Sequence, residues 1–142
     1  MSATWEPDDS RVEGPAGIER IKEALKRHDV GIEGRVVTSR DPRVDLVRLD
    51  LRRERSPEGF DQWQLPVYGD GPAFVFITSA SPGAIVPEHS HKRDLFRMVI
   101  SGSIIVNGVE LKPGDWMYVP KGVRYSYTAA FNPGAITLHI YW

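Results

Sequence analysis

Apolar residues recur with two different periods along this chain, and the change of period separates a helical segment from a β-rich one. Ile18, Ile21 and Leu25 lie three and four residues apart, with charged residues between them, so we predict an amphipathic helix over residues 15–28. Residues 1–14 are polar and show no apolar period. We expect them to form a flexible tail.

Beyond about residue 35 the apolar period becomes two, and glycines and prolines interrupt it at short intervals. The alternation over residues 44–51 predicts a strand, whereas the Gly- and Pro-rich residues 56–72 predict a long loop. Asn107 and Gly108 separate two β-branched runs, which predicts a hairpin whose two turn residues have positive φ. We expect further strands over residues 73–80, around His89, and over residues 95–100, 103–106, 109–111, 116–119, 124–128 and 135–142. Such a series of short strands is typical of a sandwich or a barrel, so we predict an all-β domain with one N-terminal helix.

The composition narrows the class of protein. A length of 142 residues suits one domain, which we place at residues 15–142, with the barrel at about 35–142. The 18 Lys and Arg residues nearly balance the 19 Asp and Glu residues, so no overall field favours nucleic acid or an anionic membrane. Cysteine is missing, so any metal must be bound through nitrogen and oxygen. The sequence shows no signal peptide and no run of 18 apolar residues, so we expect a cytoplasmic protein.

One short motif carries candidate chemistry. His89 and His91 are two residues apart, and on an extended strand that spacing places both imidazoles on the same face. Two imidazoles on one face can share a metal ion. Glycines, prolines and a tyrosine surround the pair at regular intervals, in two stretches that contain Gly83, His89, His91, Leu95 and Gly102, and then Gly114, Pro120, Gly122 and Tyr125.

The spacing of these two stretches resembles the two sequence motifs of the cupin superfamily, over roughly residues 83–129. The resemblance implies a jelly-roll barrel, a double-stranded β-helix whose pocket often holds one divalent metal. It also implies His89 and His91 as metal ligands, for Fe, Zn, Mn, Ni or Cu. Leu95 and Tyr125 stand where the family usually has a Glu ligand and a third His ligand.

Three more side chains are candidates for the pocket. If position 95 faces the lumen, as the resemblance implies, strand alternation also turns Arg97 inward. Tyr125 could supply a phenol oxygen, as a ligand-binding or catalytic group, and His139 a further imidazole if its face is the inner one. Arg97 could pair with Asp94 or Glu88, or could bind an acidic group of a ligand, because its fork matches carboxylates and phosphates.

Two classes of function remain open. The first is a metal-dependent small-molecule enzyme, of dioxygenase, isomerase, cyclase or lyase type, acting on an acidic metabolite. The second is a ligand-binding or sensing module that binds no metal and performs no reaction. Cupin barrels commonly pair, and the apolar face of the predicted helix needs a covering surface, so we expect a homodimer. Packing of that helix on its own barrel is the alternative.

Overall fold

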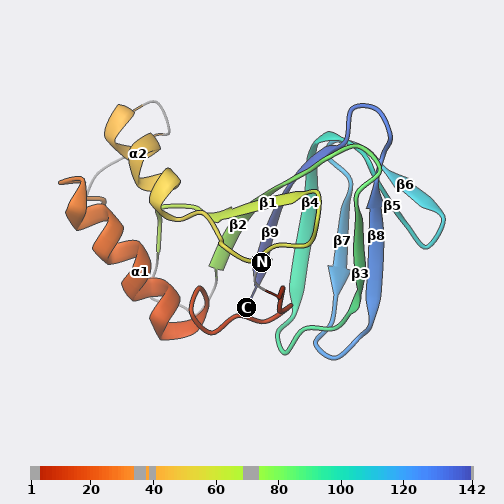
Figure 1. Ribbon diagram of the computed structural model, residues 1–142, viewed down its shortest axis with the longest axis horizontal. Coiled ribbons are helices and arrows are strands. Elements are labelled where there is room, and N and C mark those ends of the chain that lie inside the picture. The colour runs from red at the N-terminus through yellow and green to blue at the C-terminus, as the bar shows by residue number, and fades with distance from the viewer. Residues whose placement is uncertain (1–3, 34–37, 39–40, 69–73, 142) are drawn as a thin grey trace.

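Two β-sheets and two helices make up the computed structural model, which describes residues 4–33, 38, 41–68 and 74–141 (Figure 1). The helices are α1 (Gly14–Arg27) and α2 (Pro42–Asp50). The strands are β1 (Phe60–Gln64), β2 (Phe74–Ala80), β3 (Ile85–His89), β4 (Leu95–Gly102), β5 (Ile104–Val106), β6 (Val109–Leu111), β7 (Trp116–Val119), β8 (Tyr125–Ala129) and β9 (Ala135–Tyr141). The start of the predicted tail, residues 69–72 of the predicted loop and Trp142 lie outside the described residues.

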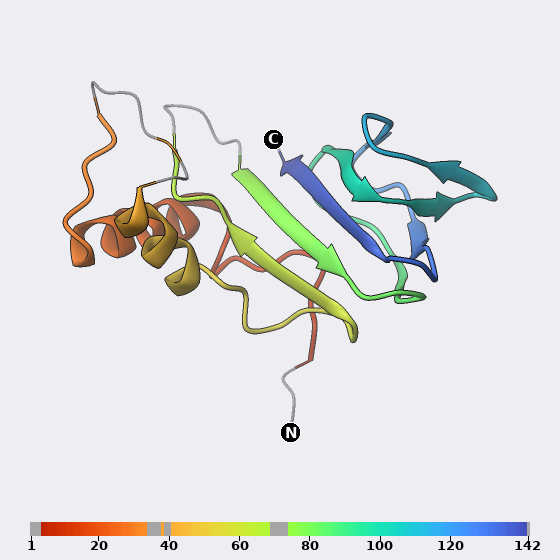
Figure 2. The same ribbon diagram turned by 90° about the horizontal axis from the view of Figure 1, so that it is seen from above.

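The strands pair antiparallel in two sheets, of order β1-β2-β9-β4-β7 and β3-β8-β5-β6. From β2 onward the chain passes back and forth between the sheets, which face each other as the two walls of a jelly roll (Figures 1 and 2). This confirms the predicted all-β class. The hairpin prediction is also confirmed, because Val106 pairs with Val109 and the turn residues Asn107 and Gly108 have φ of 50° and 77°.

The core lies between the two sheets, on the inward positions of the alternating strands. Phe76, Leu95, Val99 and Ile104 are at most 1% exposed. Tyr125, Tyr127 and Tyr141 belong to the same cluster, so the lumen is rich in phenols as well as aliphatic side chains. The lumen therefore contains phenol hydroxyl groups among its apolar side chains.

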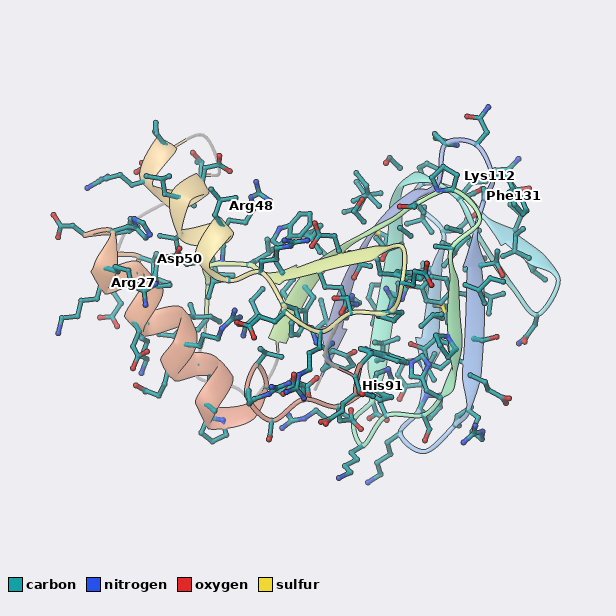
Figure 3. The ribbon with its side chains drawn as sticks, in the orientation of Figure 1. Arg27, Arg48, Asp50, His91, Lys112 and Phe131 are labelled. Atoms are coloured by element: carbon teal, nitrogen blue, oxygen red, sulfur yellow. The ribbon has the colours of Figure 1, made fainter. Side chains whose placement is uncertain are left out.

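Helix α1 forms where the apolar spacing predicts it, with a proline in its first turn and Lys26 and Arg27 in its last. Ile21 and Leu25 do not cover the barrel; together with α2 they form a second small core (Figure 1). Asp50, at the end of α2, accepts from Arg27 at 2.7 Å and so links the two helices (Figure 3).

The predicted strand at residues 44–51 is wrong, because this segment forms α2. Its buried residues Val44, Val47 and Leu51 follow helical spacing, whereas Leu46 and Leu49 remain 49% and 59% exposed. The start signal is local: the Asp41 side chain caps the helix by accepting from the backbone N–H of Arg43 at 2.9 Å, and a proline follows the cap. The described part of the chain therefore has a second helix, α2, before the barrel, where a strand was predicted.

Two further segments differ from expectation. The predicted loop contains β1, which extends the larger sheet by pairing with β2. We expected a flexible tail before α1, yet Asp9, Val12 and Glu13 are buried, and the segment runs along the end of the barrel (Figure 1). No helix among the described residues is long and apolar enough to cross a membrane.

Candidate functional site

His89 and His91 meet where strand β3 ends. Figure 3 shows His91 at this end of the barrel. A register shift between Val86 and His89 breaks the pairing of β3 with β8, and His91 follows just beyond the strand. The Nε2 atoms of the two histidines lie 3.0 Å apart, and both side chains are buried, 6% and 5% exposed. The expected convergence is present, although the strand alone does not hold it.

The other ring nitrogen of each histidine has a defined partner. His89 Nδ1 lies 2.6 Å from the carbonyl oxygen of Pro87, and His91 Nδ1 lies 3.1 Å from Asp8 Oδ1. A carbonyl and a carboxylate only accept, so both Nδ1 atoms carry the proton and donate. Both Nε2 atoms of the neutral rings therefore present lone pairs to each other across 3.0 Å.

Two facing lone pairs need a positive species between them. A proton is disfavoured, because burial lowers the pKa of both rings, and burial together with His89 lowers the pKa of His91 to about 4. A metal ion is compatible with these donors, since His89 and His91 would hold it through their two neutral Nε2 atoms. The two imidazoles thus have fixed ring orientations, with both Nε2 atoms directed at each other.

Other donors around this point are few. The Tyr125 hydroxyl lies 3.3 Å from His91 Nε2 and can donate to it or offer its oxygen. Leu95 is fully buried in the apolar core and supplies no donor. Among residues 4–33, 38, 41–68 and 74–141, no group of three or more His, Cys, Asp or Glu side chains could hold a metal. Further donors would have to come from the phenol, water or a ligand.

Arg97 enters the lumen, as strand alternation predicts, and is 3% exposed. Its Nη1 donates to Thr137 Oγ1 at 2.9 Å, and its guanidinium lies 4.9 Å from the centre of the Tyr127 ring. The Nε atom is buried and has no hydrogen-bond partner. Burial raises the pKa of Tyr127 to about 12, so this phenol is neutral and cannot balance the charge.

Arg97 does not form the ion pair with Asp94 or Glu88 that would have balanced its buried charge. Asp94 instead accepts from the backbone N–H of Lys121 at 2.9 Å, and Glu88 pairs with Arg124 at the surface. No carboxylate in the described part of the chain lies within 4.0 Å of the Arg97 guanidinium. A buried cation without a counter-ion is costly, so Arg97 needs an explanation that the described residues do not supply.

His139 lies next to Arg97 and Thr78, and it does not join His89 and His91. Its Nδ1 is 3.4 Å from Arg97 Nη1 and 3.3 Å from Thr78 Oγ1, and its ring stacks on Phe76. Because a guanidinium can only donate, Nδ1 accepts and the proton is on Nε2, which is buried without a partner. Burial, and then Arg97, holds the pKa of His139 well below its usual range.

A second buried arginine, Arg53, completes a polar row along the inner wall of the larger sheet. Arg53 is 4% exposed and donates to Gln62 Oε1 at 3.1 Å. Gln62 donates to Thr78 at 3.2 Å, and Thr78 leads to His139 and Arg97. Sequence reasoning missed Arg53, because it lies in a stretch where arginines and aspartates alternate and nothing local separates it from its neighbours.

The N-terminal segment closes this end of the lumen. Trp5 packs edge-on against His89, with ring centroids 4.9 Å apart. Asp8 accepts from the Lys92 backbone N–H at 2.9 Å as well as from His91. The cavity that remains among Trp5, the two histidines, Arg97 and their neighbours measures about 10 Å³, barely enough for one water.

The barrel also resembles known proteins. The family model described as the cupin domain matches residues 76–141. No curated protein matches the chain.

Several solved structures share the fold. KdgF from Halomonas sp. has a TM-score of 0.52 and 20% identity over 58% of this chain and 77% of that one. A Bacillus subtilis oxalate decarboxylase, a protein with Mn(II) centres, has a TM-score of 0.54 and 24% identity over 66% of this chain and 28% of that one. A chain of the Rhodobacter sphaeroides complex of SigE with the anti-sigma ChrR has a TM-score of 0.57 and 18% identity over 96% of this chain and 61% of that one. At these identities the likeness is one of fold.

Proposed function

Because the barrel of this chain belongs to the cupin superfamily, we propose that the protein is a metal-dependent enzyme acting on an acidic small molecule inside the barrel. The observation that carries the proposal is the pair of facing Nε2 lone pairs of His89 and His91, 3.0 Å apart. Their Nδ1 atoms are both committed to acceptors, so a shared cation is the natural occupant.

His89 and His91 would hold one divalent transition metal, one of Fe, Zn, Mn, Ni or Cu, with Tyr125 as a neighbouring oxygen donor. Such a metal supplies Lewis acidity toward a substrate oxygen. Asp8 keeps the His91 ring oriented through its Nδ1–H. The Tyr125 hydroxyl, 3.3 Å from His91 Nε2, is placed to donate a proton to a bound molecule. Dioxygenase, isomerase, cyclase and lyase chemistry all suit this arrangement.

The acidic character of the substrate follows from Arg97. Its Nε is unpartnered, it lacks a carboxylate neighbour within the described chain, and the donor on His139 behind it is also unmet. A carboxylate or phosphate would accept from this cluster in bidentate fashion. The same anion could supply the donor that Leu95 does not.

The second candidate is a ligand-binding or sensing module that binds no metal and performs no reaction. The observation that favours it is the small donor set, since Leu95 is apolar and no third imidazole or carboxylate joins His89 and His91 among the described residues. The match to the SigE–ChrR complex spans both helices as well as the barrel, which suits a regulatory setting equally well.

One experiment separates the two candidates. The metal-loaded protein is incubated with a panel of small carboxylic acids and phosphate esters, and binding is followed by calorimetry and conversion by mass spectrometry. An enzyme should convert at least one bound acid, and Tyr125→Phe should lower the rate more than the affinity. Binding without conversion across the panel would favour the binding module.

We also propose a homodimer, formed through the outer face of the larger sheet. The apolar face of α1 is covered within the chain, because Ile21 and Leu25 pack with α2 and Ile18 packs against the barrel core, so this face needs no partner chain. The outward positions of β4, β7 and β9 are apolar instead, and Met98, Ile100, Trp116, Tyr118 and Ile136 are 36–57% exposed. A sheet face exposed to water normally alternates to polar residues, so this face requires a cover. An uncharged face can pair with a copy of itself without repulsion.

A further inference from the structure

Residues 4–7, which we call the N-terminal tip, fill the place where a ligand would have to sit. Trp5 packs on His89, and Trp5 and Pro7 line the residual cavity of about 10 Å³. Any molecule larger than a water must therefore displace the tip before it can reach Arg97 or His89.

The tip is held weakly compared with the residues that follow it. Its main polar contact is the carbonyl oxygen of Glu6, which accepts from Arg53 Nη2 at 2.5 Å. The Glu6 carboxylate pairs with Arg55 at 3.6 Å in a partly exposed ion pair, which contributes little. Trp5 Nε1 is buried without a hydrogen-bond partner, which makes the burial of this indole less favourable. Residues 4–6 have no regular secondary structure.

The anchor is Asp8 and the residues after it. Asp8 binds His91 and the Lys92 backbone, Asp9 binds Arg11 through both carboxylate oxygens, and Val12 belongs to the barrel core. Motion of the tip can therefore pivot at Asp8 and leave the orientation of His91 unchanged.

On its other side, the tip borders an open groove. This groove measures about 690 Å³ and is lined by Pro7, His91, Lys92 and Lys121 among others. Pro7 and His91 also line the inner cavity, so the tip is the wall between groove and lumen. The volume suits a small metabolite, and Glu6 and Asp8 line the groove beside the two lysines, so the groove carries charges of both signs.

We propose that the N-terminal tip is an internal occupant of the ligand site, and that an acidic ligand enters from the groove by displacing it. The Glu6 carbonyl oxygen on Arg53 then stands where an acceptor atom of the ligand will bind, which makes Arg53 a second anion-binding residue beside Arg97. This inference rests on the proposed acidic ligand. Only molecules whose tip is open can bind the ligand. The apparent affinity of the full chain is therefore reduced in proportion to the open fraction.

The test compares the full chain with a variant lacking residues 2–7, which keeps Asp8. Oxalate, citrate and inorganic phosphate are titrated into both proteins, each loaded with the same metal, and the affinities are measured by calorimetry. If the open form is a minor state, removal of the tip should raise the affinity for at least one probe by about tenfold or more. In fluorotryptophan-labelled full chain, the Trp5 resonance should move to a solvent-exposed position as that probe binds.

Trp5→Ala keeps the full chain and should raise the affinity in the same direction, which guards against misfolding of the deletion. Phe131→Ala is the matched control, because Phe131 is 81% exposed at the opposite end of the barrel, and it should leave the affinity unchanged (Figure 3). Equal affinities for full chain and deletion, with an unmoved Trp5 resonance, would overturn the inference and leave the proposed function standing. If no probe bound even the deletion variant, the acidic ligand and the inference would both be rejected.

Discussion

Arg97→Met should make the ligand-free protein more stable, although it removes a buried side chain with two polar neighbours. The guanidinium is 3% exposed, has one unpartnered nitrogen, and lacks a carboxylate partner in the described chain. Replacement by Met keeps most of the apolar stem and removes the desolvated charge. The losses are the hydrogen bond to Thr137 and the contact with the Tyr127 ring, together about 2–3 kcal/mol.

The desolvation cost of an unpaired buried ion is several kcal/mol, so the net change in unfolding free energy should be a gain of about 1–2 kcal/mol. Urea unfolding at neutral pH measures it, with an unchanged m-value as the check that the native state is intact. Arg52→Met is the control, since the Arg52 side chain is 70% exposed and its replacement should change stability by no more than about 0.5 kcal/mol.

The same variant should bind acidic ligands more weakly, by about 2 kcal/mol or roughly 30-fold in Kd, because a desolvated charged contact is lost. A variant that is more stable than the parent but binds acidic ligands more weakly would show that the Arg97 charge serves binding and not folding. A loss of stability of more than about 1 kcal/mol, or an unchanged affinity for acids, would refute this reasoning and make Arg97 a structural residue.

Burial raises the pKa of Glu13 from 4.5 to about 7, so the native state holds its proton more tightly and stability is lost as pH rises from about 4.5 through 7. Glu13→Gln should remove roughly 3 kcal/mol of this pH dependence, measured by denaturant unfolding at pH 4 and pH 8; a profile as steep as that of the parent would contradict it. Trp116→Lys should convert the dimer to a monomer in sedimentation at micromolar concentration, and a parent that is already monomeric would reject the interface. Leu51→Ala should cost about 2–5 kcal/mol and exposed Leu49→Ala almost nothing, and similar losses for both would argue against helix α2.

Much of the barrel could be predicted from local sequence. Turn residues divide the second half of the chain into short strands, and Asn107-Gly108 gave the right hairpin because positive φ at both positions is a local requirement. The convergence of His89 and His91 was also expected from spacing, as was the inward direction of Arg97.

The remainder depends on contacts that local patterns do not contain. Residues 44–51 carry apolar side chains at both strand and helix spacing, and only packing against α1 decides which of them are buried. Asp8 reaches His91 across 83 positions of sequence, so nothing near Asp8 indicates that it orients a ring in the barrel. The burial of Arg53 depends likewise on the distant Glu6 carbonyl and on Gln62.

The most direct test of the account is the metal content of protein purified without an affinity tag, compared with that of a His89→Ala, His91→Ala double variant. Elemental analysis should find close to one divalent transition metal per parent chain and almost none in the double variant, because these are the two imidazoles whose lone pairs converge. A Lys112→Ala control, at the opposite end of the barrel from His91, should keep its metal (Figure 3). Equal metal in parent and double variant would show that the site is wrongly placed, and a parent that stays free of metal when each candidate ion is added would contradict the metal-dependent account.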